Sequence, residues 1–129
     1  MLAIFLTISF YDIAIGAGSS ITLTDQQDSY ELGHHFSILE DATGKLNIND
    51  VNRPEWASKF KKSKEKVPNY GYSKSTYWLK LRIQNESIKK DWYISLDTYY
   101  QNRVVFFKRK NDGLWDKEIT GDLIPFRDR

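Results

Sequence analysis

Cysteine is absent from the 129-residue sequence. Disulfides, thiolate metal ligands and a cysteine nucleophile are therefore excluded together. An excess of charge of one sign is also missing, because 19 basic and 17 acidic residues leave a net charge of only +2. So small a basic excess is not enough for a positively charged surface that attracts a polyanion. We therefore expect no nucleic-acid partner.

The motifs that commonly carry catalysis are missing as well. The sequence has no Gly-x-Ser-x-Gly, no His-Glu-x-x-His, no phosphate-binding loop and no dinucleotide glycine pattern. The neighbours His34 and His35 would point to opposite faces of a strand and could not converge on one metal ion. Glu40, Asp41 and Asp50 are too sparse for a calcium loop, and Asp41 is predicted to lie in a turn. We therefore predict that the protein is not an enzyme and has no catalytic residue, metal site or cofactor.

No hydrophobic run reaches the roughly 20 residues that a membrane-spanning helix needs. The most apolar stretch is Leu2–Ile15, which contains one charged residue, Asp12, and is followed by small residues from Gly16 to Ser20. This pattern predicts a signal peptide over residues 1–18, which leaves residues 19–129 as the exported domain. Because no Lys or Arg precedes the apolar stretch and Asp12 interrupts it, the alternatives are that the true start lies upstream or that the segment is a buried strand.

Aromatic residues are abundant, at 15% of the chain. Large rings favour pleated, half-buried surfaces, so this bias favours β-structure. The one helical signal follows Pro54, where Trp56 and Phe60 are four positions apart and could share one face of a helical turn. In the first half of the chain, short strand-like runs separated by turn residues cover Ile21–Thr24, Tyr30–Leu32 and Phe36–Leu39.

The second half of the chain contains the clearest strand signals. Apolar and polar residues alternate over Thr76–Gln84, which is the pattern of a strand with one buried face. A second alternating run, Trp92–Asp97, is expected to pair with it in antiparallel fashion. Val104–Phe107 and Leu114–Trp115 flank an Asp-Gly turn and predict a hairpin. Repeated short strands of this kind predict an all-β sandwich or barrel.

Aromatic rings beside polar side chains are the best candidates for function. Such groups can stack on, and hydrogen-bond to, a sugar-like or other small polar ligand. Trp78 and Arg82 lie on one face of the predicted strand, and Tyr99 and Tyr100 follow the next one. We predict these four residues as the ligand-binding residues. For Trp78 the alternative is a place in the core of the second face of the sheet.

A series of short motifs in the second half resembles one known family. The motifs are Asn69-Tyr70-Gly71-Tyr72, Tyr77-Trp78-Leu79-Lys80-Leu81, Asn85 with Ser87, Trp92, Thr120-Gly121-Asp122, and Ile124-Pro125-Phe126 with Arg129. Their order and spacing resemble the type 2 extracellular domain of bacterial seven-transmembrane receptors with diverse intracellular signalling modules. The similarity extends over nearly all of the chain after the leader.

The resemblance implies a jelly-roll β-sandwich, similar to carbohydrate-binding modules, on the periplasmic side of the inner membrane. It implies a small-molecule or carbohydrate ligand, a seven-helix membrane domain and an intracellular kinase or cyclase output. Family members continue beyond the position that matches Arg129, so we expect a fragment that lacks the last strands of the sandwich. The alternative from another class is an accessory carbohydrate-binding module of a secreted enzyme, or a freestanding lectin-like protein.

Overall fold

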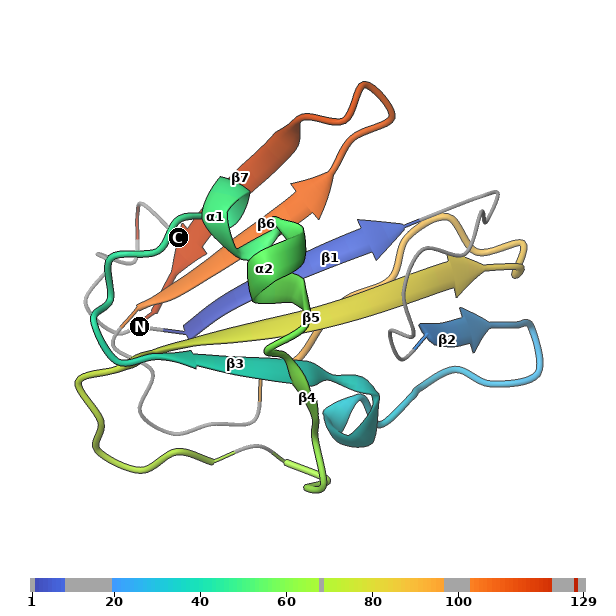
Figure 1. Cartoon of the computed structure of the whole chain (residues 1–129). Coiled ribbons are helices and arrows are strands. Elements are labelled where there is room, and N and C mark those ends of the chain that lie inside the picture. Colours follow the sequence, from blue (N-terminus) through green and yellow to red (C-terminus); the bar gives the residue numbers. More distant parts are fainter. Residues whose placement is uncertain (1, 9–19, 68, 97–102, 122–126, 128–129) are drawn as a thin grey trace.

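The computed structural model describes residues 20–67, 69–96, 103–121 and 127 in full, and residues 2–8 by their backbone. These residues form a β-rich fold with three very short helices (Figure 1). The strands are β1 (Leu2–Ile8), β2 (Ser20–Leu23), β3 (Ser37–Asp41), β4 (Lys61–Lys62), β5 (Thr76–Asn85), β6 (Val104–Arg109) and β7 (Trp115–Thr120). The helices are the 3-10 helix η1 (Gly33–His35) and the α-helices α1 (Ile48–Val51) and α2 (Pro54–Ala57).

The strands form one curled sheet in the order β4-β3-β5-β1-β6-β7 (Figure 1). The pairs β3–β4, β3–β5 and β6–β7 are antiparallel, whereas β1 runs parallel to both of its neighbours, β5 and β6. β5 is the centre of the arrangement. One of its edges pairs with β1, and the other pairs first with β3 and then with β2.

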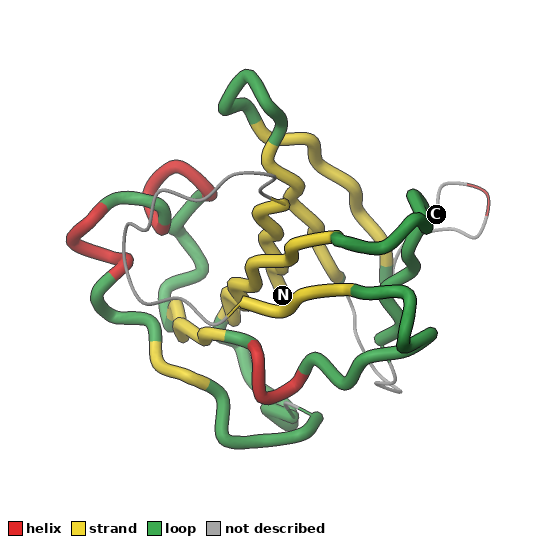
Figure 2. Tube along the Cα trace, turned by 90° about the vertical axis from the view of Figure 1, so that its right-hand side faces the viewer, coloured by secondary structure: helices red, strands yellow, loops and turns green. Residues whose placement is uncertain are grey.

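The alternation along β5 separates two faces of the sheet. We call the face that α1 and α2 cover the outer face, and the opposite one the inner face. Figure 2 shows the two α-helices on one side of the strands. Trp78 belongs to the cluster of buried residues on the outer face, and Leu79, Leu81 and Ile83 belong to the cluster on the inner face. The predicted strand over Thr76–Gln84 is thus confirmed, but the expectation of a single buried face is wrong, because residues on both faces are buried.

The outer face is closed by the segment that carries α1 and α2. Asn47 caps α1 through hydrogen bonds to two backbone N–H groups, and Pro54 begins α2, where its missing N–H costs nothing. These helices bring Val51 and Trp56 onto Trp78, whose indole stacks on Phe107 with ring centroids 5.9 Å apart. The predicted helical turn after Pro54 is confirmed. Phe60 packs against the same cluster, as expected from its spacing to Trp56.

The predicted turn at Asp41 is also confirmed. The carboxylate accepts hydrogen bonds from the Thr43 hydroxyl at 2.7 Å, the Gly44 N–H at 3.0 Å and the Leu46 N–H at 3.0 Å. It also accepts a bond from the Thr43 N–H. Gly44 has a φ of 63°, a left-handed conformation that favours glycine. The turn therefore depends on a buried anion that is held by its own loop.

Three strand-like expectations are wrong. Tyr30–Leu32 forms no strand, and His34 and His35 lie in η1 rather than in a strand. The described part of Trp92–Asp97 has no regular secondary structure and pairs with no described strand; both edges of β5 are occupied by β1 on one side and by β3 and β2 on the other. The hairpin predicted around Asp112 is confirmed as β6–β7.

The N-terminal segment is a strand in the structure of the whole chain, where Leu2–Ile8 forms β1. The strand of the alternative interpretation is therefore present in this structure, while the removal of residues 1–18 on export stays a prediction. All described strands belong to one sheet. Within the described ranges, no helix has the length and the apolar character that crossing a bilayer requires.

Candidate functional site

An open groove of about 1450 Å³ lies on the inner face of the sheet. Its floor is apolar and comes from Leu23, Ile83, Val104 and Phe106. β1 lies between β5 and β6, the strands that carry most of this floor. One wall is the segment that follows β5, and the other is the β6–β7 hairpin.

The first wall depends on a polar network at the end of β5. The Asn85 side chain accepts hydrogen bonds from the Ser87 N–H at 3.0 Å and from its hydroxyl at 2.6 Å, and donates to the Lys89 carbonyl at 2.8 Å. The Ser87 hydroxyl in turn accepts a bond from the Trp92 indole N–H at 3.2 Å. This network shapes the turn at residues 85–87 and fixes the indole of Trp92 at the groove.

Further contacts hold Trp92 in place. Its ring meets the Tyr30 ring edge-on, with centroids 5.7 Å apart and an interplanar angle of 61°. The Lys89 ammonium lies 5.5 Å from the indole centroid and also pairs with Asp28. The neighbouring Tyr93 is 94% exposed. The first wall therefore offers one fixed aromatic ring and one that is open to solvent.

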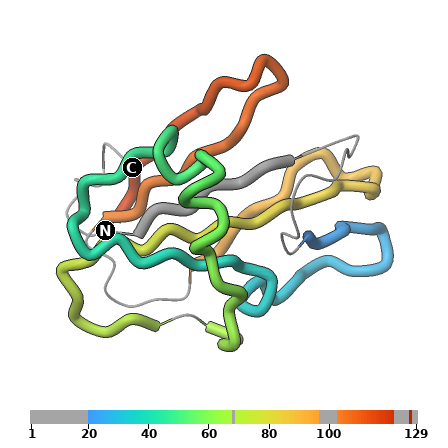
Figure 3. The backbone as a smooth tube through the Cα atoms, in the orientation of Figure 1, coloured from blue at the N-terminus to red at the C-terminus, as the bar shows by residue number. Residues whose placement is uncertain are grey.

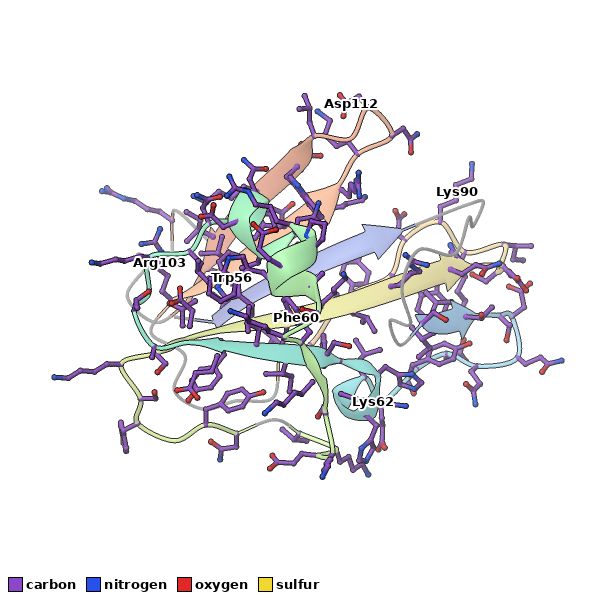
Figure 4. All side chains as sticks on the ribbon, in the orientation of Figure 1. Trp56, Phe60, Lys62, Lys90, Arg103 and Asp112 are labelled. Atoms are coloured by element: carbon purple, nitrogen blue, oxygen red, sulfur yellow. The ribbon has the colours of Figure 1, made fainter. Side chains whose placement is uncertain are left out.

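The second wall is charged. Lys108, Asp116 and Glu118 line the groove from the hairpin strands, and Lys110 forms an exposed ion pair with Asp116 at 3.6 Å. The hairpin projects away from the rest of the sheet (Figure 3). Figure 4 labels one residue of each wall, Lys90 after β5 and Asp112 at the hairpin tip.

This arrangement is suited to binding. An apolar floor, planar rings and a few charged groups are the usual components of a site for a small ligand that has both an apolar and a polar face. No group of three or more His, Cys, Asp or Glu side chains that could hold a metal ion occurs in the part of the chain that the structure describes.

The residues predicted from the sequence lie elsewhere. Trp78 is 1% exposed and packs under α1 and α2 on the outer face, so a ligand could contact it only if the helical cover opened. Arg82 is half-buried on the same face. Tyr99 and Tyr100 lie outside the described residues. The structure thus brings neither Trp78 nor Arg82 into the groove, and the ligand contacts predicted for all four residues stay predictions.

The outer face near Arg82 is electrostatically unusual. Burial lowers the pKa of the Lys80 ammonium, and the positive charges of Arg82 and Arg109 lower it further. Three cations therefore share one end of this face, beside the rings of Phe60 and Trp115. The like charges repel one another, whereas the contacts of Lys80 with the Phe60 ring and of Arg109 with the Trp115 ring are attractive.

The sequence did not identify Trp92 and Tyr93 as site residues. Apolar and polar residues alternate in this run, and that pattern predicted a paired strand. The signal that could have identified them is local. Asn85, Ser87 and Trp92 form a side-chain network within eight positions, and such networks position loops rather than strands.

Comparison with known families gives one match. A family model described as 7TMR-DISM extracellular 2 matches residues 33–129. No curated protein and no solved structure matches the chain. The β-rich fold and the family match together define an extracellular domain of a membrane receptor. The chain belongs to the type 2 extracellular domains of the seven-transmembrane receptors with diverse intracellular signalling modules, as the resemblance of its motifs predicted.

Proposed function

We propose that this domain senses a small ligand on the periplasmic side of the bacterial inner membrane and that the inner-face groove is its binding site. The observation that carries the proposal is the groove itself. There, the fixed ring of Trp92 and the exposed ring of Tyr93 stand opposite the charged β6–β7 hairpin, across an apolar floor.

The chemistry of the two walls favours a small ligand with one apolar and one polar face, such as a carbohydrate. The CH-rich face of a sugar ring packs on aromatic rings, and its hydroxyls hydrogen-bond to charged side chains. Tyr93 supplies such a ring, while Lys108 and Glu118 supply a donor and an acceptor. Arg82, Tyr99 and Tyr100 remain predicted contacts within this proposal.

A ligand that touches both walls favours the arrangement in which they are close together. Its differential affinity for two arrangements of the domain is the free energy available for signalling. We propose that the ligand's preference for one arrangement of the domain is transmitted to a seven-helix membrane domain and from there to an intracellular kinase or cyclase. In the same proposal, residues 1–18 direct export, and the complete domain is a jelly-roll sandwich.

The proposal is tested by a binding screen with neutral and acidic saccharides and small polar metabolites, measured by calorimetry. For a ligand that binds, Tyr93→Ala is expected to weaken affinity by about tenfold, which is about 1.4 kcal/mol. Tyr72→Ala is the matched control, because Tyr72 is fully exposed but lies outside the groove. Equal losses in the two variants would show that the groove is not the site.

A further inference from the structure

The β6–β7 hairpin carries different charges on its two sides. Arg109 lies opposite Trp115, and Lys117 lies opposite Phe107. Trp115 and Phe107 pack with the outer-face cluster, so the register places both cations on the outer side. The two carboxylates of β7 occupy the alternate positions, on the inner side that lines the groove. The outer side of the hairpin is therefore basic.

The basic surface continues across the sheet to β5. Lys80 and Lys117 lie in one row of the outer face, because both belong to the row that crosses Phe5 of β1. Arg82 lies further along β5, toward the end of the sheet from which the hairpin projects. Burial lowers the pKa of the Lys80 ammonium, and the charges of Arg82 and Arg109 add to this effect, as expected for neighbouring cations.

Carboxylates balance little of this charge. Among the described strand residues, Asp41 is the only carboxylate on the outer face, and it is held in its own turn at the opposite end of β5. On the hairpin, Asp116 pairs with Lys110 at 3.6 Å. Residues 108–117 contain four cations and two carboxylates, which leaves a net charge of +2. The hairpin end of the outer face is thus suited to an anionic partner.

The tip of the hairpin adds an apolar element. Leu114 is 63% exposed there, and its carbonyl accepts a hydrogen bond from the Lys110 N–H at 2.8 Å, which closes the turn. The Arg109 guanidinium lies 5.8 Å from the centroid of the neighbouring Trp115 ring. In Figure 4 the tip, labelled at Asp112, lies beyond α1 and α2. An exposed leucine, an indole and cations therefore meet at the projecting end of the sheet.

An anionic membrane surface matches this combination better than a small anion does. A bilayer presents dispersed phosphates above an apolar layer, so it can bind separated cations and an apolar tip at the same time. Tryptophan rings are favoured at the boundary between these layers. A small anion needs converging groups, whereas these cations are spread over β5, β6 and β7. The chain belongs to the extracellular domains of a membrane-receptor family, so a bilayer is close to it in the whole receptor.

We propose that the outer side of the β6–β7 hairpin docks on the anionic phospholipid surface of the membrane, with Leu114 at the polar–apolar boundary and Arg109 and Lys117 at the lipid phosphates. The inference goes beyond the proposed ligand sensing and needs no ligand in the groove. Because the inner side of the same hairpin is the second wall of the groove, docking would hold that wall at the membrane surface.

Docking is tested by sedimentation of the full chain with phosphatidylcholine vesicles, prepared with or without phosphatidylglycerol. We expect binding to the anionic vesicles and little binding to the neutral ones. The double variant Arg109→Gln, Lys117→Gln should bind roughly 25-fold more weakly, about fivefold for each cation. The matched control is Lys45→Gln, Lys74→Gln, which removes the same charge from exposed positions near the start of β5. Its binding should change by less than about twofold, because charges that lie further from the surface are screened.

Two further variants test the tip. Leu114→Ala should weaken binding to the anionic vesicles by about fivefold, because less apolar surface enters the boundary layer. The chain contains no cysteine, so Asn111→Cys can be labelled alone with a dye that brightens in an apolar environment. The dye should brighten when anionic vesicles are added, whereas the same dye on Lys74→Cys should not. All variants share the apolar N-terminal residues, so differences between them report on the hairpin.

Several results would overturn the docking surface. Equal binding to neutral and anionic vesicles, equal losses in the two double variants, or a tip dye that stays unchanged while the protein binds would each do so. If the protein ignores vesicles but binds inorganic phosphate or an acidic peptide through Arg109 and Lys117, the lipid assignment is refuted. The saccharide screen of the groove contains no lipid, so its failure and the failure of docking are distinguishable.

Discussion

The two faces of the sheet differ in how they are covered, although the same strands supply both. On the outer face, Val51 of α1 and Trp78 of β5 are each 1% exposed, where the segment that carries α1 and α2 packs on the sheet. On the inner face, loops from distant parts of the chain leave an open groove, and Tyr93 is 94% exposed at its edge. The comparison indicates that buried packing on both faces stabilises the domain, whereas an open groove lies beside the packing of the inner face.

The largest effect is expected on the outer face. Trp78→Ala removes a fully buried indole that stacks on Phe107, so we expect the free energy of unfolding to fall by about 3–5 kcal/mol. Tyr93→Ala on the inner face should change it by less than about 0.5 kcal/mol. Urea denaturation of both variants measures the difference. Similar losses of unfolding free energy in the two variants would mean that the packing of Trp78 contributes no more to stability than the exposed ring of Tyr93.

The Asp41 turn provides a second test of the closed face. Asp41→Asn keeps the shape of the side chain, but its amide cannot accept the Leu46 N–H, so we expect a loss of about 1.5–3 kcal/mol. Asp112→Asn is the matched control, because Asp112 also accepts a backbone N–H, from Leu114, but is exposed at the hairpin tip. Its cost should be much smaller.

The Asp41 carboxylate also makes the free energy of unfolding depend on pH in the acid range. Burial would by itself raise the pKa of Asp41, but hydrogen bonds from the Thr43 hydroxyl and the N–H groups of Leu46, Thr43 and Gly44 outweigh it and lower the pKa below 3.8. The stabilisation is therefore fully present above about pH 4 and is lost as the pH falls through the folded-state pKa. Unfolding curves between about pH 2 and 6 should fall more steeply for the wild type than for Asp41→Asn. Parallel curves would contradict the assignment.

The sequence predicted what depends on local patterns. The alternation around Trp78, the Asp-Gly turn at Gly113 and the Pro54 helix start each involve a few neighbouring residues, and each is confirmed. Pairing could not be predicted in this way. Trp92–Asp97 has a strand pattern but finds no free edge on β5, since one edge is occupied by Leu2–Ile8, whose residues pair with partners 75 positions away (77 − 2 = 75). The unpaired segment after β5 forms one wall of the groove. Local patterns did not reveal the groove, because they do not show which segments occupy the edges of β5.

A smaller effect is expected in the first wall of the groove. Ser87→Ala removes the acceptor of the Trp92 indole N–H and a donor to Asn85, so we expect a loss of about 1 kcal/mol in unfolding free energy. The indole N–H resonance of Trp92 should shift toward solvent-exposed values. Ser73→Ala is the control, since Ser73 accepts hydrogen bonds from the Ser75 N–H and the Tyr77 hydroxyl near the exposed start of β5. An unchanged indole resonance in Ser87→Ala would contradict the proposed role of the network.

The smallest effect at neutral pH is expected for Tyr70→Phe on the inner face. The Tyr70 hydroxyl is buried without a hydrogen-bond partner in the described part of the chain, and its ring stacks on Tyr77 at 3.8 Å. Removing an unsatisfied hydroxyl is close to neutral or slightly stabilising. Burial, followed by the charges of Glu65 and Tyr77, raises the pKa of Tyr70 to about 12.

The sign of this shift makes the variant informative at high pH. The folded state prefers neutral Tyr70, so its contribution is intact below about pH 10, the pKa of an unfolded tyrosine, and is lost as the pH rises toward 12. The wild type should therefore lose stability over this interval, and Tyr70→Phe should lose less. Fluorescence-detected denaturation at several alkaline pH values measures both curves. If they coincide, Tyr70 is solvated in the folded state, and the inner face is open further than the groove alone would indicate.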